Sequence, residues 1–428
     1  MRICDFFVKR REYMNYYKMN QKICFSLNEY DYKKISKEEF INTKGDIFFL
    51  KSSKKGVTRD TTLISDPSEI FVNNESIENI NLKKVNNKKV SNFILKKIND
   101  EKVFALNTNY KNHFLDFDKN KYKINILGLG DVGSNLAIGL KLLGSEIVKE
   151  IGLYDRNHNK LKRFEKEFNQ IGYPNNNKLP KVKIINEKNL FDCDVFIFTA
   201  SKSITKVGQD ASNVRMEQYK ANSEIIGEYA KMARKADFKG IFAVVSDPVD
   251  LLCNDVYYES NKNKSSKLDF KGLLPNQIKG YGLGVMNARA NYFSEKANMN
   301  YNKKGRVYGP HGKGLIVAND IENYNTSKSI DLTEKTINAN LEIRKIGYKP
   351  YIGPAFSSGA ISIIETLKSN FQYSTVFVNG IYYGLKNKIK KGSVLIEKNE
   401  LDDKLFQRIN NSYNNLKESY ESNKNFKI

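Results

Sequence analysis

The sequence predicts an α/β protein: a doubly wound parallel sheet, then an α+β domain, with a small α+β extension before both. Two observations predict the parallel sheet. A glycine-rich turn lies between two apolar strand-like runs within residues 124–155, and from residue 123 onward strand-like runs alternate with helical patterns, which is typical of βαβ units. The first 120 residues are instead rich in Lys, Asn and Tyr, so we expect a separate N-terminal unit.

The change of pattern sets the expected domain boundaries: an extension over residues 1–120, the parallel-sheet domain over 121–278 and the α+β domain over 279–428. The strands expected in the sheet are 124–127, 151–154, 183–185, 195–199 and 241–245. Helices are expected over 222–236, 285–297 and 401–425, and an exposed loop over 260–267. In the extension we expect strands at 46–50, 70–72 and 103–107 and a helix over 90–98.

The glycine-rich turn has the pattern Gly128-x-Gly130-x-x-Gly133 and directly follows a strand-like run. Each glycine has a physical purpose: Gly128 permits a tight turn, Gly130 lets the backbone approach a pyrophosphate, and Gly133 lets the helix pack closely on the sheet. The N-terminus of the following helix offers free N–H groups and positive potential to phosphates. The pattern therefore predicts a dinucleotide site of the Rossmann type.

Asp155 ends the second strand-like run of this unit. A carboxylate there can hydrogen-bond both ribose hydroxyls of an adenosine, and it repels a 2′-phosphate, so NAD is the expected cofactor. The neighbouring Arg156 leaves NADP open. The expected cofactor-binding residues are Gly128, Gly130, Asp131, Val132, Gly133 and Asp155.

The composition narrows the class of protein. The net charge of +23 invites a nucleic-acid partner, but no arginine-rich arm, zinc finger or aromatic RNA-binding signature accompanies it, which argues against that partner. The four cysteines are scattered and form no CxxC pair, so we expect a reduced, cytoplasmic protein without a metal site. No apolar run approaches the length of a membrane span.

Several segments after the glycine-rich turn follow one another in a recognisable order. They are DCDVFIFTA at 192–200, RMEQYKAN at 215–222, FAVVSDPVDLL at 242–252, GYGLGVMNARANYFSE at 280–295, GPHGKG at 309–314 and TVFVNGIYYGL at 375–385. In this order and spacing, residues 121–425 resemble the L-lactate/malate dehydrogenase family. The resemblance implies a Rossmann domain, the α+β catalytic domain of that family, and hydride transfer between nicotinamide and a 2-oxo or 2-hydroxy acid.

The resemblance also implies roles for three residues. His311 matches the family's catalytic histidine, which exchanges a proton with the substrate oxygen. Arg289 matches the arginine that binds the substrate carboxylate in a bidentate fork. Arg215 matches the arginine of a mobile lid, which polarises the reacting carbonyl as the lid closes.

Two departures from the family pattern bear on catalysis. Met286 stands three residues before Arg289, where the family has an Asp that orients the histidine, and a thioether cannot accept a useful hydrogen bond from an imidazolium. Asp247 stands where the family has an amide. It can supply the missing charge or contact a cationic group such as an iminium, so Asp247 joins His311 and Arg215 as a candidate catalytic residue. For Asp250 we expect only a structural role as a cap.

Substrate choice in the resembled family depends on the lid, here residues 202–214. Counting back six residues from Arg215 gives Gln209, which favours an uncharged substrate side chain, as in lactate-type enzymes. The lid lacks the usual Pro-Gly, so this register stays open. Lys349 falls near a residue that borders the substrate side chain; it could attract a further anion or simply be solvated.

Three hypotheses for function remain at this point. The first is an NAD-dependent oxidoreductase acting on a 2-oxo or 2-hydroxy acid or a related carbonyl. The second is an imine or dehydroamino-acid reductase with a specialised or peptide substrate, and the third is a degenerate NAD(H)-binding protein without turnover. The expected partners are a small carboxylate substrate and, for the basic extension, an acidic peptide or protein. The resemblance implies a homodimer or homotetramer.

Overall fold

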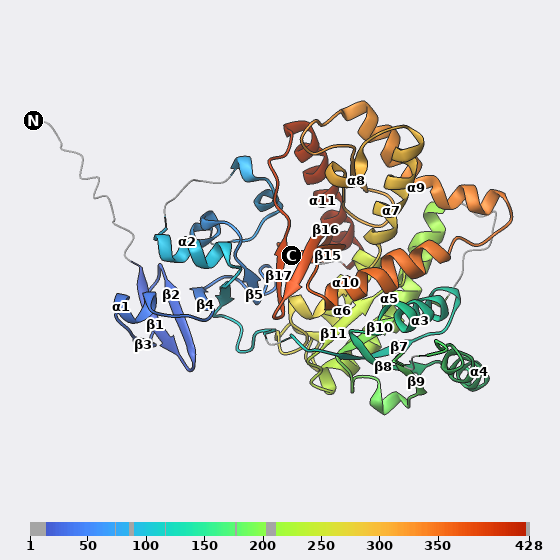
Figure 1. Ribbon diagram of the computed structural model, residues 1–428, viewed down its shortest axis with the longest axis horizontal. Helices are drawn as coiled ribbons and strands as arrows, with labels where there is room; N and C mark the ends of the chain where they lie inside the picture. Colours follow the sequence, from blue (N-terminus) through green and yellow to red (C-terminus); the bar gives the residue numbers. More distant parts are fainter. Residues whose placement is uncertain are drawn as a thin grey trace, which may run out of the picture.

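A six-stranded parallel sheet forms the centre of the Rossmann domain in the computed structural model, which describes residues 14–72, 74–84, 90–115, 117–175, 178–202 and 211–424 (Figure 1). Its strands run in the order β9-β8-β7-β10-β11-β12, which is the doubly wound order of dinucleotide-binding domains. Every pairing in the sheet is parallel. The strands are β7 Tyr122–Leu127, β8 Val148–Tyr154, β9 Lys181–Ile184, β10 Val195–Phe198, β11 Ile241–Val244 and β12 Ile278–Gly280.

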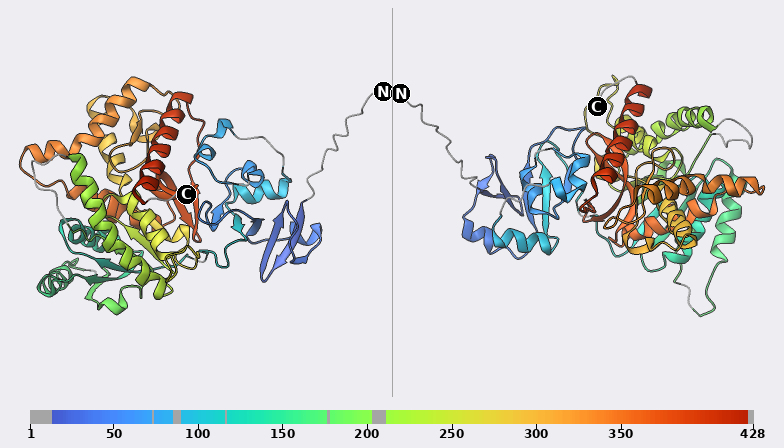
Figure 2. Two further views of the ribbon diagram at one scale, coloured as in Figure 1. Left: turned by 180° about the vertical axis from the view of Figure 1, so that it is seen from behind. Right: turned by 90° about the horizontal axis from the view of Figure 1, so that it is seen from above.

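Helices connect these strands and cover the sheet (Figures 1 and 2). They are α3 Asp131–Leu143, α4 His158–Asn169, α5 Ala211–Lys235 and α6 Val249–Ser260. Helix α4 shows how local sequence sets an element: the Asn157 side chain accepts a hydrogen bond from the Lys160 N–H, and Leu161 and Phe168 are buried. The predicted doubly wound sheet is confirmed, and the expected strands differ from the observed ones only near their ends.

The α+β domain follows β12. Its elements are α7 Leu283–Lys296, α8 Tyr301–Lys304, β13 Arg306–Tyr308, β14 Ile316–Ala318, α9 Thr326–Lys345, the π-helix η6 Pro354–Ile361, α10 Ser362–Leu367, β15 Gln372–Val378, β16 Ile381–Lys390, β17 Ser393–Ile396 and α11 Asp403–Lys424. Strands β15 and β16 form the late antiparallel pair expected at residues 375–385. The expected helices at 285–297 and 401–425 correspond to α7 and α11.

The N-terminal extension shares a sheet with the α+β domain. It contributes β1 Asn15–Met19, β2 Lys22–Ser26, β3 Lys33–Lys34, α1 Lys37–Ile41, β4 Ile47–Lys51, β5 Thr61–Leu63, α2 Asn92–Asn99 and β6 Val103–Asn107. Within the described residues, nine strands form the order β15-β16-β17-β5-β6-β4-β2-β1-β3, and β17 meets β5 at Val394 and Thr62. The extension therefore continues the sheet of the α+β domain, beside which it lies in each view (Figures 1 and 2).

One expected strand in the extension is wrong. Residues 70–72 belong largely to a 3-10 helix, Pro67–Phe71, rather than to a strand. Asp66 caps this helix by accepting a hydrogen bond from the Ser68 N–H, and Pro67 occupies its first turn. Capping residues and an N-terminal proline both favour a helical turn, so they outweigh the short apolar run that suggested a strand.

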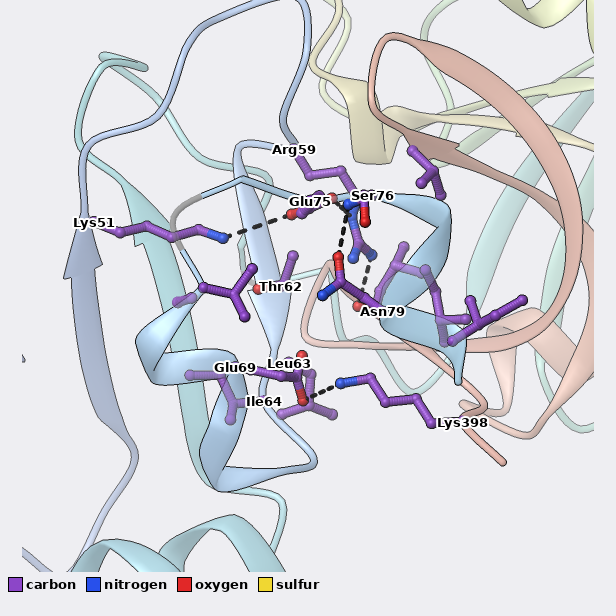
Figure 3. Close-up of a pocket in the computed structure, with 16 residues that line it drawn as sticks. Lys51, Arg59, Thr62, Leu63, Ile64, Glu69, Glu75, Ser76, Asn79 and Lys398 are labelled. Atoms are coloured by element: carbon purple, nitrogen blue, oxygen red, sulfur yellow. Dashed lines mark hydrogen bonds and ion pairs between the residues drawn. The ribbon is translucent and has the colours of Figure 1, made fainter. Parts of the chain in front are cut away.

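An ion pair and a hydrogen bond join the extension to the region of β17, and two further ion pairs lie on the extension side of this seam (Figure 3). Glu75 pairs with Arg59 at 2.8 Å and with Lys51 at 3.7 Å, and the side chains involved are at most 12% exposed. Lys398, just after β17, pairs with Glu69 at 2.6 Å, and the Arg59 guanidinium also donates to the Val394 carbonyl. These contacts enclose a cavity of only about 40 Å³, which is too small for an organic ligand. The seam is therefore a structural joint.

Candidate active site

The glycine turn has the backbone geometry that its sequence predicts. Gly128 has φ +94°, and a Cβ there would lie 2.9 Å from the Ala200 nitrogen. Gly130 is the N-cap of α3 and has no neighbouring atom within 4 Å of a Cβ position, so its backbone is open to a ligand. A Cβ on Gly133 would lie 2.1 Å from the Gly128 oxygen, so only glycine allows the helix this close to the turn. The turn and the α3 N-terminus can hold a pyrophosphate.

Asp155 lies directly after β8 and faces this turn. One carboxylate oxygen accepts a hydrogen bond from the Leu129 N–H at 2.8 Å, and the other accepts one from the Asn157 N–H at 2.9 Å. Lys160 lies 3.6 Å from the same carboxylate. A carboxylate oxygen has a second lone pair for a further hydrogen bond, so this fixed side chain can still accept bonds from ribose hydroxyls. The structure thus brings Asp155 to the glycine turn, as the sequence predicts.

His311 lies in the loop between β13 and β14, and its ring is held from one side. The Nδ1 atom lies 2.8 Å from the Gly282 carbonyl oxygen. Because a carbonyl oxygen only accepts, Nδ1 carries the hydrogen and Nε2 is the other, reactive nitrogen in the neutral ring. The His311 side chain is 13% exposed. The arrangement presents Nε2 as a base, or as an acid once it is protonated.

Two residues that position His311 are not evident from the sequence. Asp250, expected to be only a cap, accepts a hydrogen bond from the His311 backbone N–H at 3.1 Å, and burial raises its pKa to about 7. Gly282 supplies the carbonyl, and a Cβ there would lie 2.9 Å from the His311 Cβ. Ser358 donates a second hydrogen bond to the same carbonyl, which fixes the direction of that acceptor.

Asp247 lies on the reactive side of the imidazole. Its carboxylate is 3.9 Å from His311 Nε2, and its side chain is 53% exposed. Met286 is buried in an apolar cluster, where its sulfur lies 3.8 Å from Arg289 Nη1. The negative charge near His311 therefore comes from the loop after β11 and lies at Nε2, whereas Nδ1 is held by a backbone carbonyl.

Arg289 lies on α7, in the same site. No carboxylate in the described part of the chain is within ion-pair distance of its guanidinium. Burial lowers its pKa, and the charge of Asp247 opposes this shift. A half-buried guanidinium without a carboxylate partner is suited to bind an anion from outside the protein. Arg289, His311 and Asp247 are thus brought together.

The remaining candidates are placed less directly. Arg215 belongs to the first turns of α5, but its side chain, like Gln209 and residues 203–210 of the expected lid, lies outside the described residues. Lys349 forms a 3.1 Å ion pair with Asp131 at the start of α3. The structure therefore places Lys349 beside the glycine turn, where it neutralises the charge of Asp131, an expected cofactor-binding residue. Val132, which is also expected to bind the cofactor, follows Asp131 in α3.

Comparison with known proteins gives matches over most of the chain after the extension. Residues 122–268 match the family model described as lactate/malate dehydrogenase, NAD binding domain. The malate dehydrogenase of Aliarcobacter butzleri is 26% identical over 323 residues, which is 70% of this chain and 96% of the relative. The L-lactate dehydrogenase of Borrelia hermsii is 24% identical over 322 residues, which is 69% of this chain and 96% of that relative. The family model and these relatives both indicate the lactate/malate dehydrogenase family.

Solved structures of this family share the fold. A lactate dehydrogenase from a Medee basin deep-sea metagenome library superposes with a TM-score of 0.58 at 22% identity and covers 71% of this chain and 99% of its own. The malate dehydrogenase of Archaeoglobus fulgidus in complex with NADH gives a TM-score of 0.57 at 19% identity, with 70% and 99% covered. The matched family model begins at residue 122, so the extension lies outside it.

These matches support NAD as the cofactor and an NAD-dependent dehydrogenase of this family. They do not distinguish the substrate, because lactate and malate dehydrogenases match at similar identity. The matched proteins are described as dehydrogenases of small acids, so they lend no support to a peptide or protein partner of the extension. Among the described residues, no helix is long and apolar enough to cross a membrane, and no group of three or more His, Cys, Asp or Glu could hold a metal ion.

Proposed function

We propose that this chain transfers a hydride between NAD and a 2-oxo or 2-hydroxy acid or a related carbonyl compound. The observation that carries this proposal is the grouping of Arg289, whose guanidinium has no carboxylate partner among the described residues, with His311, whose Nε2 is left for the substrate, in a chain with a glycine turn shaped for a dinucleotide. When bound, NAD supplies the nicotinamide carbon that gives or takes the hydride. The residues that would hold it are those of the glycine turn together with Asp155.

Arg289 would bind the substrate carboxylate. Its planar guanidinium can donate two parallel hydrogen bonds to a carboxylate, which fixes the orientation of the acid as well as its position. The partly buried surroundings that lower the pKa of Arg289 also strengthen its attraction for an anion. Lys349 is a weaker candidate for substrate recognition, because it is paired with Asp131.

His311 would move the proton. In the direction of oxidation, Nε2 accepts the hydroxyl proton while the hydride leaves the same substrate carbon; in reduction, protonated Nε2 returns that proton to the carbonyl oxygen. The hydrogen bond from Nδ1 to Gly282 selects this tautomer. Asp247, 3.9 Å from Nε2, stabilises the protonated ring and so takes over part of the task that Met286 cannot perform. Arg215 would polarise the carbonyl, and Gln209 would contact the substrate side chain.

A second candidate function is the reduction of an imine or dehydroamino acid, and Asp247 is the observation that favours it. Its half-exposed carboxylate lies on the substrate side of His311, where it would repel a carbonyl oxygen that gains negative charge but attract an iminium nitrogen. In this function Arg289 would still bind a carboxylate. The two functions therefore differ in the charge beside Asp247: negative on the oxygen in ketone reduction, and positive on the nitrogen in imine reduction.

The test is NADH oxidation by the purified full-length protein with a panel of 2-oxo acids, from pyruvate to bulky and acidic ones, with and without ammonium. Turnover without ammonium that is lost in Arg289→Ala supports 2-oxo acid reduction. Turnover only with ammonium, lost in Asp247→Asn, supports the imine. Tight NADH binding without turnover, unchanged in His311→Ala, would contradict both and leave the chain an NAD-binding protein.

A further inference from the structure

A cleft of about 720 Å³ lies between the extension and the Rossmann domain. One wall comes from the extension and the segment after β6, with Lys55 and residues 110–115. The other wall comes from the end of α5 and two later loops, with residues 233–239 and 269–277. The cleft volume falls within the range of small-molecule sites, and neither wall would form it alone.

The cleft is separate from the candidate active site. Phe238 and Lys239 lead into the amino end of β11, and Gln277 directly precedes the amino end of β12. The glycine turn and Asp247, by contrast, follow the carboxyl ends of β7 and β11. Since the two ends of parallel strands lie at opposite edges of a sheet, a ligand in this cleft would not compete with NAD or substrate. The segment after β6 leads into the amino end of β7, at the same edge of the sheet.

Buried hydrogen bonds fix the wall that the extension provides. The Tyr110 hydroxyl lies 3.1 Å from the Tyr257 hydroxyl of α6. Asp60 is fully buried and accepts a hydrogen bond from the Phe114 N–H at 2.7 Å, and the Asn276 side chain donates to the Thr61 carbonyl at 2.7 Å. Because both walls are tied to the same buried polar groups, the cleft is preformed.

Five basic side chains line the cleft, and three of them form no ion pair with the described residues. Arg234 and Lys239 are neutralised by Asp269 and Asp237, at 2.7 and 2.5 Å. The other three cations, Lys55, Lys111 and Lys271, have no carboxylate within ion-pair distance in the part of the chain that the structure describes. His113 adds no charge, because burial lowers its pKa. The rim is thus cationic.

The floor of the cleft is apolar. Phe270, Leu273 and Leu274 line it next to the buried Phe238. The Phe270 ring lies against Gly56 of the extension, where a Cβ would be 2.9 Å from the ring. Above this apolar floor lie three ammonium groups that have no carboxylate within ion-pair distance among the described residues, and that of Lys55 lies over the Tyr110 ring. Such a lining matches a molecule with an organic body and one or more anionic groups, for which lysines are common ligands.

We propose that this cleft binds a phosphorylated organic molecule of nucleotide size. Its phosphate would lie among Lys55, Lys111 and Lys271, and its ring or sugar would lie on Phe270 and Leu274. The proposal gives the extension a role that the dehydrogenase activity does not require: it completes a second ligand site at the edge of the sheet opposite the active site.

Calorimetric titration of the full-length protein in saturating NADH tests this proposal, since NADH then occupies the dinucleotide site. The probes are AMP, ribose 5-phosphate and inorganic phosphate. We expect AMP to bind, and the double variant Lys111→Glu/Lys271→Glu to weaken it at least tenfold, or about 1.4 kcal/mol. The matched control Lys328→Glu/Lys345→Glu changes the same charge on exposed positions of α9 and should leave AMP affinity unaltered.

The proposal is overturned if AMP does not bind, if both double variants weaken it equally, or if inorganic phosphate binds as tightly as AMP. Ribose 5-phosphate weaker than AMP indicates a nucleotide, whereas equal affinity indicates a sugar phosphate; both agree with the proposal. Thermal melts and NADH affinity of the variants should match those of the unaltered protein, because the substituted lysines are exposed and remote from the glycine turn.

Discussion

The substitution Gly282→Ala tests whether a backbone carbonyl, rather than a carboxylate, orients His311, the proposed proton donor and acceptor. Gly282 has φ −122° and ψ −29°, which alanine can adopt, so the effect comes from contacts alone. The new Cβ would lie 2.9 Å from the His311 Cβ and 3.1 Å from Val249 Cγ2. Carbon atoms prefer separations of about 3.5–4.0 Å, so His311 must move by roughly 0.5–1 Å or its 2.8 Å bond to Gly282 must lengthen.

A displacement of about 1 Å at a reacting group can cost roughly a hundredfold in rate, so we expect kcat to fall about tenfold to a hundredfold. Overpacking should lower the free energy of unfolding by about 1–3 kcal/mol, and the NADH dissociation constant should not change. The assays are steady-state NADH oxidation, thermal melting and fluorescence titration. Gly227→Ala is the control, because its Cβ would meet Glu259 at an ordinary 3.4 Å. A Gly282→Ala protein with unaltered kcat would refute the orienting role of this carbonyl.

Gly133→Ala places a Cβ 2.1 Å from the Gly128 oxygen, so the free energy of unfolding should fall by about 1–3 kcal/mol and NADH should bind at least about tenfold more weakly in a fluorescence titration. Unaltered NADH binding would contradict a pyrophosphate site at this turn. Asp247→Asn removes a charge 3.9 Å from His311 Nε2. Because the Asp247 side chain is half exposed, we expect the activation free energy to rise by about 1 kcal/mol, so that kcat falls roughly fivefold. An increase in kcat would contradict the supporting role of Asp247. Burial raises the pKa of Asp60 to about 7, so the folded protein keeps a proton that the unfolded chain releases above about pH 4. The free energy of unfolding should therefore fall as the pH rises from about 4 to 7. Asp60→Asn should flatten this fall in thermal melts, and an unchanged slope would contradict the prediction.

The sequence predicted the Rossmann domain well because its signals are local. The pattern Gly128-x-Gly130-x-x-Gly133 and the acid at Asp155 lie within one βαβ unit, and the turn, the open backbone and the close helix packing are all observed. Buried parallel strands also read as continuous apolar runs, so β7, β8, β10 and β11 were predicted within a few residues of their bounds. Local motifs of this kind need no knowledge of distant contacts.

What the sequence missed depends on distant contacts or on the backbone. The carbonyl of Gly282 carries no signal in its residue type, and the hydrogen bond that the His311 N–H donates to Asp250 joins residues 61 positions apart. The pairing of β17 with β5 likewise joins residues far apart in the chain, Val394 and Thr62. The extension, expected as a separate unit, therefore belongs to a shared sheet. Residues 66–72 contain both a capping signal at Asp66 and a short apolar run typical of a strand, and the contacts of the folded chain favour the helical turn.

In the proposed function, Arg289 and His311 act together on a substrate that carries a carboxylate beside its reacting carbon. The most direct measurement compares kcat/KM for a 2-oxo acid and for the corresponding ketone without the carboxylate, in the unaltered protein and in Arg289→Ala. Charge-assisted hydrogen bonds contribute about 1.5–3 kcal/mol each, so we predict that the variant loses a hundredfold or more on the acid and little on the ketone. Equal losses on both, or no preference for the acid in the unaltered protein, would contradict the account.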